Sequence, residues 1–136
     1  MMPNQPQPLH AAAELADAAS PELDSEALAR LTELDPNGEN QLLERVLRAF
    51  QTSAARLMPQ LEAARLSKDS ATIRLVAHTL KSSSASIGAL DLSQACAHIE
   101  ALIRTEAGAK LDAPLDAMRA ALDSALNAIQ RLLDKQ

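Results

Sequence analysis

Apolar residues recur along most of this chain at alternating steps of three and four positions, the spacing that places them on one face of an α-helix. Four long series follow one another. They cover residues 39–66, about 70–87, 91 to the expected helix end at Gly108, and 112–133. Because short connections join them, they predict four long antiparallel helices in an up-down four-helix bundle. The positions expected to face the core are Leu43, Leu47, Phe50, Ala54, Leu57, Leu61, Ala64, Ile73, Val76, Ala77, Leu80, Ser83, Ser84, Ile87, Leu92, Cys96, Ile99, Ile103, Leu115, Met118, Leu122, Ala125, Ile129 and Leu132.

A shorter apolar series precedes these four. Leu23, Leu28, Leu31 and Leu34 share one side of a helix, and the turn sequence Asp35-Pro36-Asn37-Gly38 follows them. A helix this short is not stable alone in water, so we expect it to pack against the others. The predicted fold is therefore all-α, a four-helix bundle with a short extra N-terminal helix.

Local signals set the expected ends and breaks of these helices. Pro59 lies inside the first long series and predicts a bend rather than two helices, because proline lacks one backbone donor. Asp69 is the expected N-cap of the helix that starts near residue 70, and Gly88 is expected to end that helix in a left-handed conformation. Asp91 with Gln94 resembles a capping box for the following helix.

Composition supports an all-α single domain. The chain has 136 residues, with one Phe, no Trp and no Tyr, so the aromatic residues that favour strands are almost absent. Residues 1–20 hold Pro3, Pro6 and Pro8 among polar residues and alanines, a composition that cannot bury enough apolar surface to fold. We therefore expect a tail or linker over residues 1–20 and one helical domain over residues 21–136.

Charge and cysteine content exclude several functions. The net charge is −5 and the basic residues are scattered, so nucleic acid is not an expected partner. Cys96 is the single cysteine, which allows neither an intrachain disulfide nor a cysteine zinc site, and its place in the apolar pattern predicts a core residue. No signal peptide or membrane span is recognisable, so we expect a cytoplasmic protein that is not bound to membrane.

One histidine stands out from the helical pattern. His78 lies on the side of its helix opposite the apolar series, and Lys81 follows one turn later on the same side. The residues around it are mostly small, which would let a second protein bring a reactive group close to the imidazole. A large residue at position 82 or 85 should block that approach. The expected docking residues are Ala71, Arg74, Leu75, Ser82 and Ala85.

Histidine and lysine at this spacing suit phosphoryl transfer. Imidazole has an unperturbed pKa of about 6.5 and so offers a neutral, nucleophilic nitrogen near pH 7. The Lys81 ammonium would place positive charge beside the transferred group. The chain has three glycines, none of them in a phosphate-binding loop, so no nucleotide site is visible. We therefore expect a protein that relays phosphate and does not take it from ATP.

The run His78-Thr-Leu-Lys-Ser-Ser-Ser-Ala-Ser-Ile-Gly-Ala resembles the H-x-L-K-G-S-S signature of histidine-containing phosphotransfer (HPt) domains, and the helical order from about 24 to 134 agrees. The resemblance implies a four-helix bundle whose exposed histidine passes phosphoryl groups between the aspartates of response-regulator receiver domains. It implies His78 as phosphoacceptor and Lys81 as its charge partner, with a hybrid sensor kinase and receivers as partners. Mg²⁺ would belong to the receiver, and no cofactor to this chain. Ser82 replaces the usual glycine.

Glu100 is a further candidate. It follows His78 by 22 positions, and HPt-like domains often carry Glu or Gln facing the histidine at this place. It could accept a hydrogen bond from one ring nitrogen and leave the other to attack phosphorus. The alternative is a partly solvated carboxylate with no such role. His98 is expected at the surface, His10 belongs to the tail, and the glutamates do not form a di-iron pattern.

Two other functions remain open at this stage. A helical adaptor would bind receivers on the same face without phosphotransfer. The dimerisation and phosphoacceptor part of a histidine kinase also carries a histidine on a helical hairpin, but that family has an acidic residue directly after the histidine and a proline soon after. Here Thr79 follows, and the next proline is Pro114. We expect a monomer, either free-standing or the end of a larger hybrid kinase.

Overall fold

The structure, a computed structural model, describes residues 23–106 and 108–135. These residues form five α-helices and no strand, which confirms the all-α prediction. The helices are α2 (Ser25–Glu33), α3 (Leu42–Ser67), α4 (Ser70–Ser86), α5 (Leu90–Thr105) and α6 (Asp112–Asp134). The tail or linker expected over residues 1–20, with His10, lies outside the described residues.

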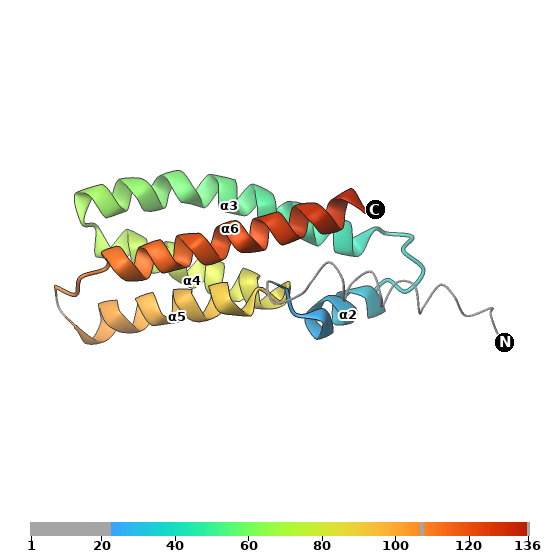
Figure 1. Cartoon of the computed structure of the whole chain (residues 1–136), viewed down its shortest axis with the longest axis horizontal. Coiled ribbons are helices and arrows are strands. Elements are labelled where there is room, and N and C mark those ends of the chain that lie inside the picture. Colours follow the sequence, from blue (N-terminus) through green and yellow to red (C-terminus); the bar gives the residue numbers. More distant parts are fainter. Residues whose placement is uncertain (1–22, 107, 136) are drawn as a thin grey trace.

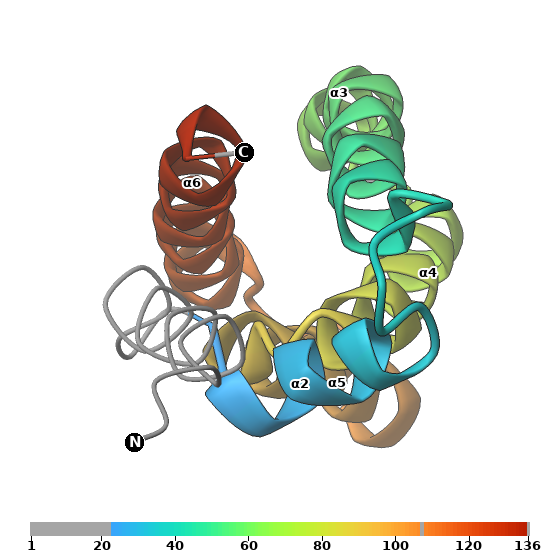
Figure 2. The same ribbon diagram turned by 90° about the vertical axis from the view of Figure 1, so that its right-hand side faces the viewer.

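The four long helices run antiparallel to their chain neighbours and form an up-down bundle (Figure 1). Contact is most extensive between α4 and α5, and α3 packs on α4 while α6 packs on α5. The first and last members, α3 and α6, meet much less (Figure 2). The pair α4 and α5 therefore forms the middle of the bundle.

The predicted core faces are confirmed for almost every position. Each apolar series packs into one continuous core, in which Leu80, Cys96, Met118 and Leu122 have no exposed surface. Leu43, Ser83 and Ile103 are only half-buried. In the short leading series, Leu23, just before α2, and Leu28, within it, are buried. Leu34 is 73% exposed because α2 ends one residue before it.

Two predictions about the helices are confirmed, the N-cap at Asp69 and a single helix through Pro59. The Asp69 carboxylate accepts a hydrogen bond from the Thr72 N–H at 3.2 Å and caps α4. The helix α3 continues through Pro59 as one helix. The capping box at Asp91 is wrong: α5 begins at Leu90, so Asp91 is already inside its first turn, and Ala89 stands at the N-cap without a side-chain hydrogen bond. Gly108 lies three residues beyond the last residue of α5.

The turn between α4 and α5 is fixed by a close backbone contact. Gly88 adopts the expected left-handed conformation with φ +79°, and its carbonyl accepts a hydrogen bond of 2.7 Å from the N–H of Asp24. A Cβ atom at position 88 would lie 2.6 Å from that nitrogen, so no side chain fits. This contact brings the start of α2 to the α4–α5 turn at the end of the bundle (Figure 2).

Candidate functional site

His78 lies on α4 with its side chain 61% exposed, as its position in the helical pattern predicted. The opposite side of the same helix is buried through Ile73, Val76, Ala77 and Leu80. The burial of that side fixes the rotation of α4 about its axis, because turning the helix would expose four core residues. The imidazole is thereby held at the surface by packing on the far side of its own helix.

Glu100 contacts the imidazole from the neighbouring helix. Its Oε2 atom lies 2.9 Å from Nδ1 of His78, and its side chain is only 11% exposed. The structure thus brings together the two residues that the sequence analysis placed face to face. Glu100 is buried rather than a partly solvated carboxylate on the flank of the helix.

Lys81 completes a three-residue cluster with His78 and Glu100. Its Nζ atom lies 2.7 Å from Oε1 of Glu100, so each carboxylate oxygen faces a different partner. The Lys81 hydrogen bond lowers the pKa of Glu100, burial opposes this, and the hydrogen bond with His78 lowers the pKa further. The carboxylate is therefore ionised at neutral pH. Sequence reasoning missed the ion pair between Lys81 and Glu100, because it depends on how the two helices are aligned.

The ionised carboxylate fixes the state of the imidazole ring. A carboxylate without a proton can only accept hydrogen bonds, so the Nδ1 atom of His78 must be the donor. In a neutral ring the other nitrogen, Nε2, then holds the free lone pair. The exposed imidazole thus has one nitrogen held by the protein and one available to another molecule.

The α4–α5 pair is held in register next to this cluster. The Ser93 hydroxyl of α5 donates a hydrogen bond of 3.0 Å to the Lys81 carbonyl of α4. Cys96, one turn before Glu100 on α5, is fully buried, and burial raises the pKa of its thiol to about 12, helped by the charge of Glu100. The thiol therefore stays protonated at neutral pH, in agreement with the predicted core role.

The expected docking residues all lie at the surface. Ala71, Arg74, Leu75, Ser82 and Ala85 are exposed, with Leu75 at 63%. Beside them, a shallow pocket of about 210 Å³ opens between α4 and α5, lined by Arg74, Glu100, Ile103 and Arg104. Sequence analysis did not single out Arg104. No pattern within one helix could have paired it with Arg74.

Other groups considered from the sequence lie apart from this site. His98 is exposed on α5, which confirms its predicted place at the surface. Within residues 23–106 and 108–135, no group of three His, Cys, Asp or Glu side chains is placed to hold a metal ion. In the same part of the chain, no helix is both long and apolar enough to cross a membrane.

Comparison with protein-family models matches residues 45–133 to the Hpt domain. The chain belongs to the Hpt domain family. The match contains His78, Lys81 and Glu100, and it leaves α2 outside. Among solved structures, histidine-containing phosphotransfer protein B (HptB) from Pseudomonas aeruginosa PAO1 superposes with a TM-score of 0.74. It shares 24% sequence identity, over 86% of this chain and 98% of that chain, a likeness that shows the fold. A search among curated protein sequences gives no match.

Family membership makes this chain a phosphorelay protein of the histidine phosphotransfer type, and the Hpt domain is not itself an ATP-dependent kinase. The family match begins inside α3, so the short helix α2 lies outside the matched residues.

Proposed function

We propose that His78 of this Hpt domain accepts a phosphoryl group from the phosphorylated aspartate of one receiver domain and passes it to the aspartate of another. The observation that supports this most is that the protein binds only one of the two ring nitrogens of His78. The Nδ1 atom lies 2.9 Å from the Glu100 carboxylate, and the side chain is 61% exposed. A ring nitrogen with a free lone pair therefore faces solvent, where a partner can reach it.

The proposed transfer step uses this geometry. The Nε2 lone pair attacks the phosphorus of the receiver's acyl phosphate, an N–P bond forms, and the bond from phosphorus to the aspartate oxygen breaks. The aspartate leaves as a carboxylate, so no proton has to move in the step. The ring becomes positively charged and keeps its Nδ1 proton, which the Glu100 carboxylate stabilises. Donation to a second receiver is the reverse step, and the receiver would supply the Mg²⁺.

Lys81 would stabilise the transferred group. Its ammonium has three donors and is 37% exposed, so it can contact the phosphoryl oxygens while it remains close to Glu100. The small exposed side chains of Ala71, Ser82 and Ala85 leave room above the ring for the receiver. In these terms, Glu100 is a positioning residue and Lys81 an electrostatic one.

The test is phosphoryl transfer from purified receiver domains. Each receiver of a panel is labelled on its aspartate and mixed with the chain, and acid-labile, base-stable label is then followed. We expect label on the wild-type chain and none on His78→Gln. The matched control is His98→Gln, which removes the other exposed histidine of the described region and should keep the label.

Two outcomes would contradict the proposal. Label that persists in His78→Gln would exclude His78 as the acceptor. Binding of receivers without label on the wild-type chain would favour the adaptor function. Sedimentation of the same samples decides between the expected monomer and a dimeric kinase fragment.

A further inference from the structure

The pocket beside His78 lies between two arginines from different helices. Arg74 precedes His78 by one turn on α4, and Arg104 follows Glu100 by one turn on α5. The half-buried side chain of Ile103 supplies an apolar part of the lining. The pocket measures about 210 Å³, whereas one water needs only about 10–15 Å³. It therefore has room for an inserted side chain.

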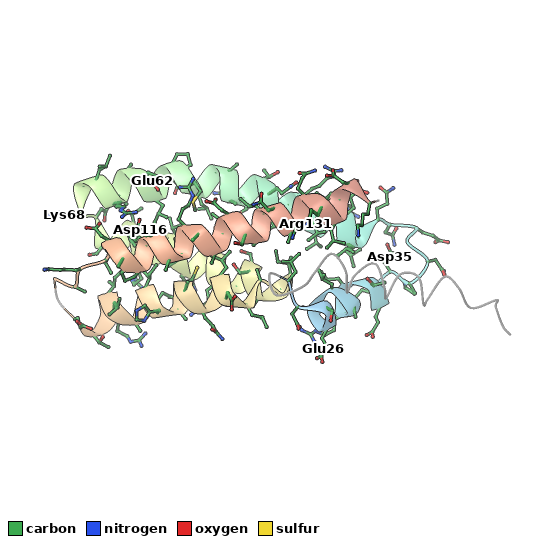
Figure 3. The ribbon with its side chains drawn as sticks, viewed as in Figure 1. Glu26, Asp35, Glu62, Lys68, Asp116 and Arg131 are labelled. Atoms are coloured by element: carbon green, nitrogen blue, oxygen red, sulfur yellow. The ribbon has the colours of Figure 1, made fainter. Side chains whose placement is uncertain are left out.

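Neither of these arginines has an ion-pair partner among the described residues. The contrast is with α3 and α6, where Arg65 lies 2.8 Å from Asp116 and Arg119 lies 3.1 Å from Glu62. Figure 3 shows Glu62 and Asp116 on these two helices. Glu100 also lines the pocket, but its two carboxylate oxygens already face Lys81 and His78. Within the part of the chain that the structure describes, the positive charge of these two guanidinium groups is therefore not neutralised by an ion pair.

We infer that this pocket receives a carboxylate side chain, Asp or Glu, from the docked receiver domain. The inference rests on the proposed function, because it assigns a second point of contact to the same encounter. Guanidinium groups bind carboxylates through two parallel hydrogen bonds, which fix orientation as well as position. Since residues one turn apart on a helix have Cβ atoms about 5–6 Å apart, a carboxylate held at Arg74 would fix the position of the receiver directly beside the ring of His78.

Such a contact affects how the receiver binds, and it does not take part in the phosphoryl-transfer step. Charge complementarity at an interface mainly raises the rate of association and selects among partners. Receivers with an acidic side chain at the matching distance from their phosphorylated aspartate would be preferred. Receivers with a basic side chain there would be rejected, because like charges would meet in the pocket.

The experiment measures transfer from a receiver that labels the wild-type chain. Because each chain accepts one phosphoryl group, the experiment is a single turnover at several receiver concentrations. It gives a maximal rate constant, here called kcat, and a half-saturating receiver concentration, here called KM, for wild type, Arg104→Glu and Arg104→Gln. We expect KM to rise at least tenfold in Arg104→Glu and less in Arg104→Gln, with kcat within about twofold. The charge-matched control is Arg56→Glu, an exposed α3 arginine, which should leave KM within about twofold. If the acidic side chain of the receiver that enters the pocket is changed to arginine, the KM of Arg104→Glu should return toward the wild-type value.

Several results would overturn the inference. One is a KM in Arg104→Glu no higher than in Arg56→Glu. A second is a fall in kcat in the Arg104 variants, or a fall in their labelling by phosphoramidate, a small donor that needs no docked protein. Either fall would mean that Arg104 takes part in the transfer step itself. A third is binding of inorganic phosphate to the pocket, seen by NMR of the guanidinium groups, with no effect of the variants on KM. Absence of label on the wild-type chain with every receiver would instead contradict the proposed function.

Discussion

The Nζ atom of Lys81 lies 2.7 Å from Oε1 of Glu100, whose other oxygen lies 2.9 Å from Nδ1 of His78. One buried carboxylate thus organises both groups assigned to phosphoryl transfer. Lys81 neutralises Glu100 in this structure. In the proposed phosphorylated state, the phosphoryl group and the Glu100 carboxylate would compete for the same ammonium. Under the proposed function, the charge of Glu100 would therefore weaken the hold of Lys81 on the phosphoryl group, in addition to its effect on the ring.

Replacement of Glu100 should separate these two effects. Glu100→Gln keeps an oxygen that can accept the Nδ1 hydrogen bond, so we expect a transfer rate within a few-fold of wild type. Glu100→Ala leaves the ring without a partner and should lower the rate by roughly tenfold to a hundredfold, as loss of orientation does elsewhere. Single-turnover transfer measures the rates, and ¹⁵N shifts of the imidazole report its tautomer. Glu106→Ala, just past the end of α5, is the control. Equal rates for Glu100→Ala and wild type would contradict the positioning role.

The lowered pKa of Glu100 predicts a pH dependence of stability. Because the pKa of the folded state lies below the ordinary value of 4.5, the ionised carboxylate stabilises the fold fully above about pH 4.5. That stabilisation is lost as the pH falls through the pKa of the folded state. The free energy of unfolding of wild type minus that of Glu100→Gln should therefore shrink between neutral pH and pH 3 in urea titrations. The pKa of Asp69 is also lowered, by its bonds to Thr72, but both proteins share it and it cancels in the difference. A difference that stays constant with pH would refute the assignment.

Bulk at position 82 should block the receiver. Ser82 is exposed one turn after His78 and stands where the HPt signature usually has glycine. Ser82→Phe would place a ring over the approach to the imidazole, and we expect transfer from a receiver to fall at least tenfold. Ala117→Phe, at an exposed position of α6, is the control and should transfer normally. Transfer by Ser82→Phe at the wild-type rate would show that the receiver approaches from another side.

The glycine in the α4–α5 turn offers a test of the contact with α2. Gly88→Ala and Gly108→Ala both place a side chain at positive φ, +79° and +73°, which costs about 1–2 kcal/mol each. Only at position 88 would the new Cβ meet backbone, at 2.6 Å from the Asp24 nitrogen, whereas nothing lies within 4 Å at position 108. Overpacking of this kind costs about a further 1–3 kcal/mol. Urea unfolding should thus show Gly88→Ala as the less stable variant, and equal stabilities would mean that α2 moves away at no cost.

The sequence predicted the parts of this fold that depend on one helix at a time. Helical periodicity identified the buried faces and placed His78 at the surface, because the 3.6-residue repeat is a property of each segment alone. The ion pair between Lys81 and Glu100 and the pocket at Arg104 depend on how far α4 and α5 slide past each other. That register is set by side-chain packing and the Gly88 turn, which no periodicity encodes.

The helix ends show the same limit on a smaller scale. Asp69 caps α4 as predicted, since a cap is a local hydrogen bond. Asp91 does not cap α5, because the tight turn at Gly88 lets the helix start at Leu90. Leu34 belongs to the predicted apolar series but is 73% exposed, because α2 ends at Glu33, before this position. Predictions from spacing are thus weakest where a turn decides which residue begins or ends a helix.

His78, Lys81 and Glu100 all come from one helical hairpin, α4 with α5, and are separated by no more than 22 residues of chain. Contacts between nearby segments close short loops and form early in folding, whereas α3 and α6 meet only when the whole chain has assembled. We expect the site to be among the first parts of the molecule to form and the last to open. In native-state hydrogen exchange, the amides of α4 and α5 should therefore be the most protected. Opening along the α3–α6 edge would then leave the imidazole, the carboxylate and the ammonium in place.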